Sequence, residues 1–126
     1  MCLYKFGKFN TRKKIGFKIF NDENHYLSSY IRGSMKRLPV GKWLNEKDYR
    51  DKTDFNMKYL RTEDKYENYK FGWHIYYYKS DENYFSSWCV KRKVKFRKIV
   101  AKGYQDGKRI VVAKEIYIIP LKKMKK

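Results

Sequence analysis

The densest chemical feature of the sequence is the run KRKVKFRK at residues 91–98, in which six of the eight side chains are basic. Val94 and Phe96 alternate with the cations, and such alternation is typical of a strand with one buried face. The cations would then share the other face, either as contacts for phosphates or as solvated charges that discourage edge pairing. An exposed nuclear-import peptide is disfavoured, since it would leave both apolar side chains in solvent.

Basic residues are in excess well beyond this run, especially in the last third of the chain. The formal net charge is +19, and residues 83–126 carry fourteen Lys and Arg against only Asp106 and Glu115. A genome bias toward Lys would raise Asp and Glu as well, and in this segment they stay rare. A domain with this imbalance repels itself and is stabilised by a polyanion. The charge therefore predicts nucleic acid, an acidic protein surface or an anionic membrane as the partner.

The second set of reactive side chains is the histidine pair His25 and His74. If the fold brings them together with Arg32 and a tyrosine, they could cleave RNA by acid–base catalysis. Small basic ribonucleases also work with Lys, Arg and Tyr by stabilising the phosphorane. The alternative is that each histidine is a hydrogen-bonded residue of a strand.

No metal, cofactor or membrane span is expected. Two histidines and two distant cysteines, Cys2 and Cys89, lack the spacing of metal ligands. GKW at residues 41–43 lacks the rest of a P-loop, and no dinucleotide glycine motif or acidic cluster is present. Two cysteines make no disulfide framework, and no apolar run reaches the length of a membrane span. These features favour a cytoplasmic protein with reduced thiols and no membrane partner.

The elements that must position these residues are clearest in the last third of the chain. Asp-Gly at 106–107 between two β-rich runs predicts a hairpin over about 90–119 with Gln105 opposite Lys108. A strict register would put Arg97 on the apolar face, so we expect a β-bulge near Arg97–Lys98. Val94 would then face Ile118, and Phe96 would face Ile116. The cations and rings expected together on the outer face, and hence at the binding site, are Lys91, Lys93, Lys95, Arg97, Lys98, Lys102, Tyr104, Arg109 and Tyr117.

The remaining segments complete a small α+β fold that is mostly antiparallel sheet. We expect a strand over 13–21 with Ile15, Phe17 and Ile19 on one face, extended segments over 25–45, and a long loop over 46–68. A strand follows over 69–79, and Ser80 and the acids after it predict one short helix at about 81–88. Residues 1–120 would form a single basic domain, and 121–126 a basic tail.

Aromatic side chains make up 19% of the chain and gather between residues 66 and 88. A small domain needs about half of these rings for its core. The others, if exposed beside cations, would favour unpaired bases of nucleic acid. The sequence does not sort the two groups.

Four segments together resemble a pattern found in small phage and prophage proteins: SSYIRG (28–33), GKWL (41–44), FGWHIYYY (71–78) and VAKGYQDGKRIVVAKEIYI (100–118). That pattern has a Y-R-G segment, a G-F-H segment and a hairpin that ends in VVVA-[KR]-E; here Trp73 replaces the Phe of G-F-H and Ile31 separates Tyr30 from Arg32. The resemblance implies a phage-type source and carries no activity or catalytic residue. Small charged phage proteins often disable host nucleases, including RNA-guided ones.

Three hypotheses about function follow. The first is a non-catalytic binding protein for nucleic acid, with RNA favoured, or for a host nucleoprotein, encoded by a phage as an inhibitor of a defence nuclease. The second is a small ribonuclease or nucleotide-modifying enzyme that uses His74 or His25 with Arg32. The third is a protein–protein inhibitor whose basic face binds an acidic surface.

Overall fold

The computed structural model of the chain describes residues 3–23, 26–31, 34–49, 59–77, 89–105 and 107–120. Within these residues the secondary structure is antiparallel β-sheet and a single 3-10 turn, Glu46–Asp48. The strands are β1 (Lys5–Phe6), β2 (Ile15–Glu23), β3 (Tyr26–Ile31), β4 (Ser34–Leu38), β5 (Trp43–Asn45), β6 (Tyr59–Arg61), β7 (Asn68–Lys70), β8 (Trp73–Tyr76), β9 (Cys89–Gln105) and β10 (Lys108–Ile118).

The expected dominance of antiparallel sheet is confirmed, and the described part of the chain is closer to all-β than to α+β. The predicted helix at 81–88 and the predicted tail at 121–126 lie outside the described residues. The strand expected over 69–79 is divided, because Phe71 and Gly72 separate β7 from β8.

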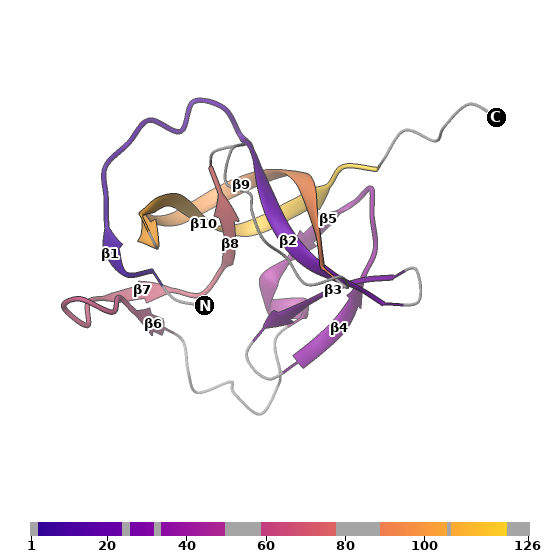
Figure 1. The fold of residues 1–126 in the computed structure, drawn as a ribbon, viewed down its shortest axis with the longest axis horizontal. Helices are drawn as coiled ribbons and strands as arrows, with labels where there is room; N and C mark the ends of the chain where they lie inside the picture. Colours follow the sequence, from indigo (N-terminus) through magenta and orange to yellow (C-terminus); the bar gives the residue numbers. More distant parts are fainter. Residues whose placement is uncertain are drawn as a thin grey trace.

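Four strands pair in a closed circuit that forms a small barrel. β9 pairs with β10, β10 with β8, β8 with β2, and β2 again with β9. β1 extends the sheet beyond β9, β5 pairs with the far part of β10, and β3 and β4 continue from β2. Figure 1 shows β9 and β10 as a long twisted hairpin beside β8 and β2, with the segment between β1 and β2 arching over one end.

The C-terminal hairpin has the register expected from its Asp-Gly turn. Gln105 lies opposite Lys108, and Ala101 lies opposite Val112. Beyond this point the register shifts by one residue, so Phe96 faces Ile116 and Val94 faces Ile118 as predicted. These last pairings confirm that one extra residue is needed on β9.

The position of this irregularity differs slightly from the expected one. Ile99 pairs with Ala113 and Ala101 with Val112, which makes Val100 the extra residue. Lys98, where we expected the bulge, has a φ of 63°. This left-handed residue lets Ile99 pack on the same core as Phe96, although their positions differ by an odd number.

The interior of the barrel holds the main core. Side chains from all four circuit strands fill it, and strands β4 and β5 contribute one leucine each. Its fully packed members are Phe20, Leu38, Leu44, Trp73, Ile75, Val94, Phe96, Val111, Ala113, Ile116 and Ile118. Trp73 also donates its indole N–H to the backbone carbonyl of Leu44 at 3.2 Å, which joins β8 to β5.

A second core lies on the outside of the barrel wall. Ile110 and Val112 on β10 meet Tyr69 and Phe71 from the β6–β7 region, and Leu3 and Leu60 complete the group. β10 is therefore covered on both faces over residues 110–113, all of which are fully buried. This explains why that part of β10 is a continuous apolar run and not an alternating one.

The prediction that one hairpin face carries all the cations is wrong for three residues. Val111, which packs in the barrel, lies opposite Lys102, and Tyr104 lies opposite Arg109 on the same side of the hairpin. These three polar or aromatic side chains surround Phe9 at the end of the barrel. On β9 the extra residue at Val100 reverses the faces after Ile99, and β10 changes face as well, since Val111 and Ala113 pack in the same core as Ile116 and Ile118.

On strand β2 the apolar positions of the alternating pattern lie on the outer face of the barrel. Ile15, Phe17 and Ile19 share a face as predicted, but it is the outer face, because they lie opposite Lys95, Lys93 and Lys91. The inner positions of β2 are Gly16, Lys18 and Phe20. A lysine inside the barrel is the feature that the alternation of β2 did not indicate.

Candidate nucleic-acid interface

The outer face of strands β2, β9, β10 and β5 combines cations with aromatic rings. The strand pairings align one residue from each strand in a row, Ile15, Lys95, Tyr117 and Trp43. The neighbouring positions on β9 and β2 add three lysines or arginines and one further ring. We call this surface the basic–aromatic face, and define it by Lys91, Lys93, Lys95, Arg97, Phe17, Trp43 and Tyr117.

Three cation–ring contacts order this face. The guanidinium carbon of Arg97 lies 3.9 Å from the centroid of Trp43. The ammonium of Lys95 lies 5.2 Å from the Tyr117 ring, and that of Lys91 lies 5.4 Å from Phe17. Trp43 and Tyr117 themselves are in ring contact, with centroids 5.6 Å apart. All three rings are half-buried, so each is held by packing and still presents part of its surface.

Glu115 is the acid that holds the end of this face. Its carboxylate accepts hydrogen bonds from Arg97 Nε and, at 3.0 Å, from Asn45 Nδ2, and the Lys98 ammonium lies 3.4 Å away. The hydrogen bonds from Arg97 and Asn45 lower the pKa of Glu115 below its ordinary value. A carboxylate that stays ionised fixes the Arg97 guanidinium on Trp43. It also offsets local charge, so the lysines of β9 carry most of the net positive charge of the face.

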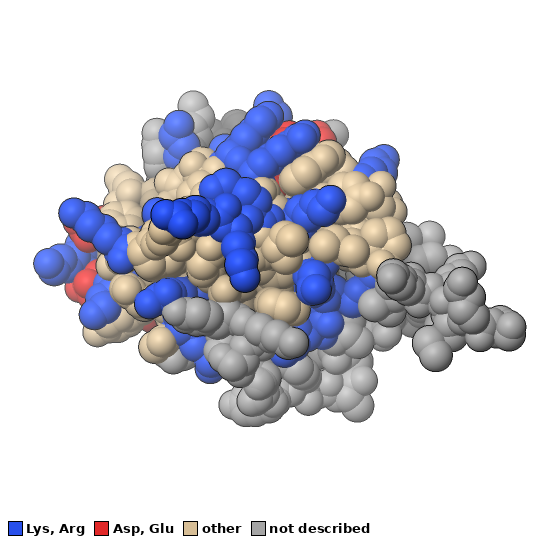
Figure 2. Space-filling model, turned by 90° about the horizontal axis from the view of Figure 1, so that it is seen from above, with Lys and Arg blue, Asp and Glu red and all other residues tan. Residues whose placement is uncertain are grey.

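The lysines of β9 are placed to follow a phosphate backbone. Lys93 and Lys95 are exposed, and Lys91 is half-buried. Alternate residues of a strand are about 7 Å apart, so the Cα atoms of the three lysines span roughly 14 Å. Figure 2 shows many Lys and Arg side chains over one side of the molecule, with Asp and Glu only near its margins.

Of the nine residues predicted for the binding site, five lie on the basic–aromatic face: Lys91, Lys93, Lys95, Arg97 and Tyr117. Lys98 borders it through Glu115, and its side chain is 61% exposed. Lys102, Tyr104 and Arg109 do not join it, as described above.

These three residues hold the segment between β1 and β2. The Lys102 ammonium donates to the Phe9 carbonyl at 2.9 Å, and the Arg109 guanidinium lies 5.4 Å from the Phe9 ring. The Tyr104 ring contacts Phe9 at 5.9 Å between centroids. Their contacts support a role in packing Phe9 against the barrel end.

Three further cations, Lys18, Arg92 and Lys114, are engaged within the fold. The Lys18 ammonium donates to the His74 carbonyl at 3.0 Å, and burial lowers the pKa of Lys18 to about 8. Arg92, which the sequence pattern did not place, donates to the Ile119 carbonyl at 2.9 Å. Lys114 pairs at 3.1 Å with Glu46, which is almost fully buried.

His74, the candidate general base, lies against the second core. Its Nε2 is 3.1 Å from the hydroxyl of Tyr69, which also accepts a hydrogen bond from the Leu3 N–H. Burial, and then the nearby Lys18 ammonium, lower the pKa of His74 to about 3. The imidazole is therefore neutral at physiological pH and is used in a structural contact. His25 and Arg32, the other candidate catalytic residues, lie outside the described residues.

Sequence reasoning missed two rings of the face, Trp43 and Phe17. The alternation of its strand places Phe17 on an apolar face, and nothing in the sequence gives Trp43 a role. Both reach the lysines through pairings between distant segments, β5 with β10 and β2 with β9. Only the short GKW segment marked Trp43 in the sequence, and it gave no sign of its neighbours.

Within the described residues, no group of three or more His, Cys, Asp and Glu side chains could hold a metal ion. The same part of the chain contains no helix long and apolar enough to cross a membrane.

Comparison with known proteins identifies no relative of this chain. No family model matches it, and no curated protein or solved structure is significantly similar to it.

Proposed function

We propose that this protein is a non-catalytic binding protein that holds single-stranded nucleic acid, with RNA favoured, on its basic–aromatic face. The observation that carries the proposal is the row in which Lys95, Tyr117 and Trp43 lie side by side, with Arg97 stacked on Trp43. Cations that follow the backbone, beside rings that receive bases, are the combination that single-strand binders use.

The arrangement favours single strands over duplexes. In a duplex the bases are stacked inside, so the rings of Trp43 and Tyr117 would add little to binding. Unpaired RNA can place its bases on aromatic rings or on an Arg guanidinium plane, and the stacked pair of Arg97 and Trp43 provides both. The lysines of β9 then supply attraction to phosphates through counterion release.

We extend the proposal to a biological setting through the resemblance to phage proteins. A phage-encoded protein of this kind would act in the host cytosol as an inhibitor of a defence nuclease. An RNA-guided nuclease depends on a guide strand and a displaced DNA strand, both of which are polyanions with accessible bases. The basic–aromatic face would compete for one of them.

Fluorescence anisotropy with a labelled 20-nucleotide single-stranded RNA, its DNA equivalent and the RNA duplex tests the binding function. We expect the RNA single strand to bind most tightly, with log affinity falling linearly against log salt by about 0.7 per phosphate neutralised. Absence of binding at low salt, or an affinity that does not change with salt, would contradict the proposal.

The docking of the basic face on an acidic protein is the competing explanation, and a pull-down from host lysate separates it. A partner that is lost after nuclease treatment supports nucleic-acid binding. A stoichiometric protein partner that survives nuclease treatment would instead support the protein–protein explanation.

A further inference from the structure

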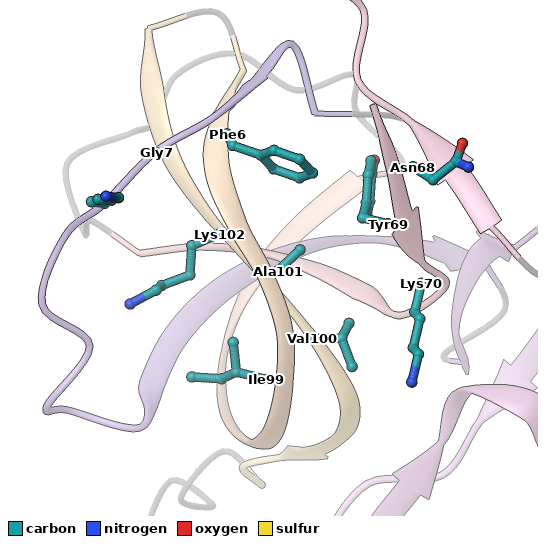
Figure 3. Close-up of a pocket in the computed structure, with 10 residues that line it drawn as sticks. Phe6, Gly7, Asn68, Tyr69, Lys70, Ile99, Val100, Ala101 and Lys102 are labelled. Carbon is teal, nitrogen blue, oxygen red and sulfur yellow. The ribbon is translucent and has the colours of Figure 1, made fainter. Parts of the chain in front are cut away.

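A cavity of about 740 Å³ opens between β1, β7 and the irregular segment of β9, and shares no residue with the basic–aromatic face. Figure 3 shows its lining side chains. They are Phe6, Gly7, Lys8, Asn68, Tyr69, Lys70, Ile99, Val100, Ala101 and Lys102. Pockets of roughly 300–1,000 Å³ are the size that small organic ligands and cofactors occupy.

The floor of the cavity is apolar because of the bulge on β9. Val100 is the extra residue of the register, and it lies between Ile99 and Ala101, which belong to opposite cores. A bulge changes the direction of side chains and is common beside binding sites. Here three consecutive half-buried apolar residues line the same hollow, an arrangement that a regular strand could not give.

One wall of the cavity carries two aromatic rings. Phe6 is 38% exposed and meets the buried Tyr69 edge to face, with centroids 5.9 Å apart. The Tyr69 side chain is held in place by its hydroxyl, which accepts a hydrogen bond from the Leu3 N–H and contacts His74. Figure 3 shows both rings on the same side of the hollow. The exposed surface of Phe6 is therefore a supported platform for a flat apolar group.

The charged part of the lining is basic. It comprises Lys8, Lys70 and Lys102, and none of the ten lining residues carries a carboxylate. Lys102 is engaged with the Phe9 carbonyl, whereas Lys8 and Lys70 have exposed side chains. Figure 3 shows Lys70 and Lys102 on opposite sides of the hollow. An occupant should accordingly be anionic as well as flat.

From these features we infer that the cavity binds a nucleoside monophosphate group, either free or as the phosphorylated end of a strand. The base would stack on Phe6 above the floor of Val100 and Ala101, and the phosphate would meet the ammonium group of Lys70. Asn68 offers both a donor and an acceptor to the edge of the base. This site is separate from the proposed strand-binding face, so either proposal can fail without the other.

Isothermal titration calorimetry with the four nucleoside 5′-monophosphates tests the site. We expect at least one of them to bind, and the corresponding nucleoside and inorganic phosphate to bind at least tenfold more weakly than the best nucleotide. Lys70→Gln and Phe6→Leu should each weaken the best nucleotide about tenfold. Lys65→Gln, which removes an exposed charge on the same β6–β7 hairpin outside the cavity, should leave affinity unchanged. Phe6→Leu keeps an apolar contact with Tyr69, and its thermal unfolding reports whether the fold is intact.

A second arm distinguishes the two sources of the group. RNA with a 5′-phosphate is compared with the same RNA carrying a 5′-hydroxyl, in the Lys93→Gln/Lys95→Gln background that weakens the basic–aromatic face. If the phosphorylated RNA binds more tightly and Lys70→Gln abolishes this difference, the site binds the end of a strand. Binding of mononucleotides without any such difference assigns it to free nucleotides. The inference is overturned if no mononucleotide and no phosphorylated end binds, or if Lys70→Gln and Phe6→Leu bind as the wild type does.

Discussion

The central carbon of the Arg97 guanidinium lies over the Trp43 ring, 3.9 Å from its centroid, while Arg97 Nε donates to Glu115. The two residues belong to β9 and β5, which are both neighbours of β10. Glu115, on the strand between them, is thus the anchor of a stacked cation and ring. This pre-organised pair extends the aromatic row of Trp43 and Tyr117 by one more planar group, on which a base can stack.

Replacing Trp43 tests whether that platform binds bases. We expect Trp43→Ala to weaken single-stranded RNA about tenfold or more, because base–aromatic stacking contributes about 1–3 kcal/mol per base. Trp43→Phe should recover part of the loss, since it restores a ring under Arg97. Anisotropy at fixed salt measures both. Tyr4→Ala, which removes an exposed ring outside the face, is the matched control, and an equal loss in that variant would show that Trp43 has no special role.

Removing two lysines of β9 tests the electrostatic part of binding. Lys93→Gln/Lys95→Gln should lower the slope of log affinity against log salt by about 1.4, since each phosphate contact to a single strand contributes about 0.7. The control variant Arg61→Gln/Lys65→Gln loses the same charge from exposed positions of the β6–β7 hairpin. Equal slopes for the two double variants would mean that total charge, and not this face, governs binding.

The lysine inside the barrel should make stability rise in mild alkali. Burial lowers the pKa of Lys18 from 10.5 to about 8. Below pH 8 the ammonium is charged in both the folded and unfolded states, and its desolvation cost is present in full. Between pH 8 and 10.5 the folded protein releases this proton before the unfolded chain does, so the free energy of unfolding rises, by about 2–3 kcal/mol.

Urea unfolding at pH 7, 9 and 10 measures this effect. A rise in pH also lowers the net positive charge, which stabilises so basic a protein. The variant Lys42→Met, at an exposed site, retains both this general effect and the effect of Lys18. Lys18→Met should keep only the general part and give a flatter curve. If both variants follow the same curve, Lys18 is not the group responsible.

A glycine marks the closure of the barrel between β2 and β8. A Cβ on Gly16 would lie 2.6 Å from Ile75 Cγ2 and 2.7 Å from the Tyr76 carbonyl oxygen. Because one of these atoms is backbone, the two strands would have to separate, and we expect Gly16→Ala to cost about 2–3 kcal/mol. Gly107→Ala has open space around it but a φ of 77°, and should cost only about 1 kcal/mol. Chemical denaturation compares the two, and equal small losses would argue against a tight closure at Gly16.

The C-terminal hairpin was predictable because its information is local. The Asp-Gly turn fixed the register near Gln105 and Lys108, and the apolar pattern required an extra residue before Phe96 could face Ile116. The alternation in KRKVKFRK correctly placed Val94 and Phe96 in the core. The error concerned Lys102, Tyr104 and Arg109, since the pattern of apolar residues shows neither the bulge at Val100 nor the change of face on β10 between Ala113 and Ile116.

The rest of the candidate site depends on contacts between distant segments. Nothing near Phe17 or Trp43 in the sequence shows that β2 and β5 lie on either side of the β9–β10 hairpin. The burial of Lys18 could not be predicted for the same reason, because it results from the closing of the barrel and not from the alternation of its own strand. Composition therefore predicted the type of partner, whereas only the topology shows which cations and rings are neighbours.

The most direct test of the basic–aromatic face is photo-cross-linking to single-stranded RNA that contains 4-thiouridine, with the modified residues located by mass spectrometry. Adducts are expected at Trp43, Tyr117 or Phe17, and they should disappear in Lys93→Gln/Lys95→Gln and in excess unlabelled RNA. Adducts confined to aromatic residues elsewhere, such as the exposed Tyr4 and Tyr66, would contradict binding at the basic–aromatic face.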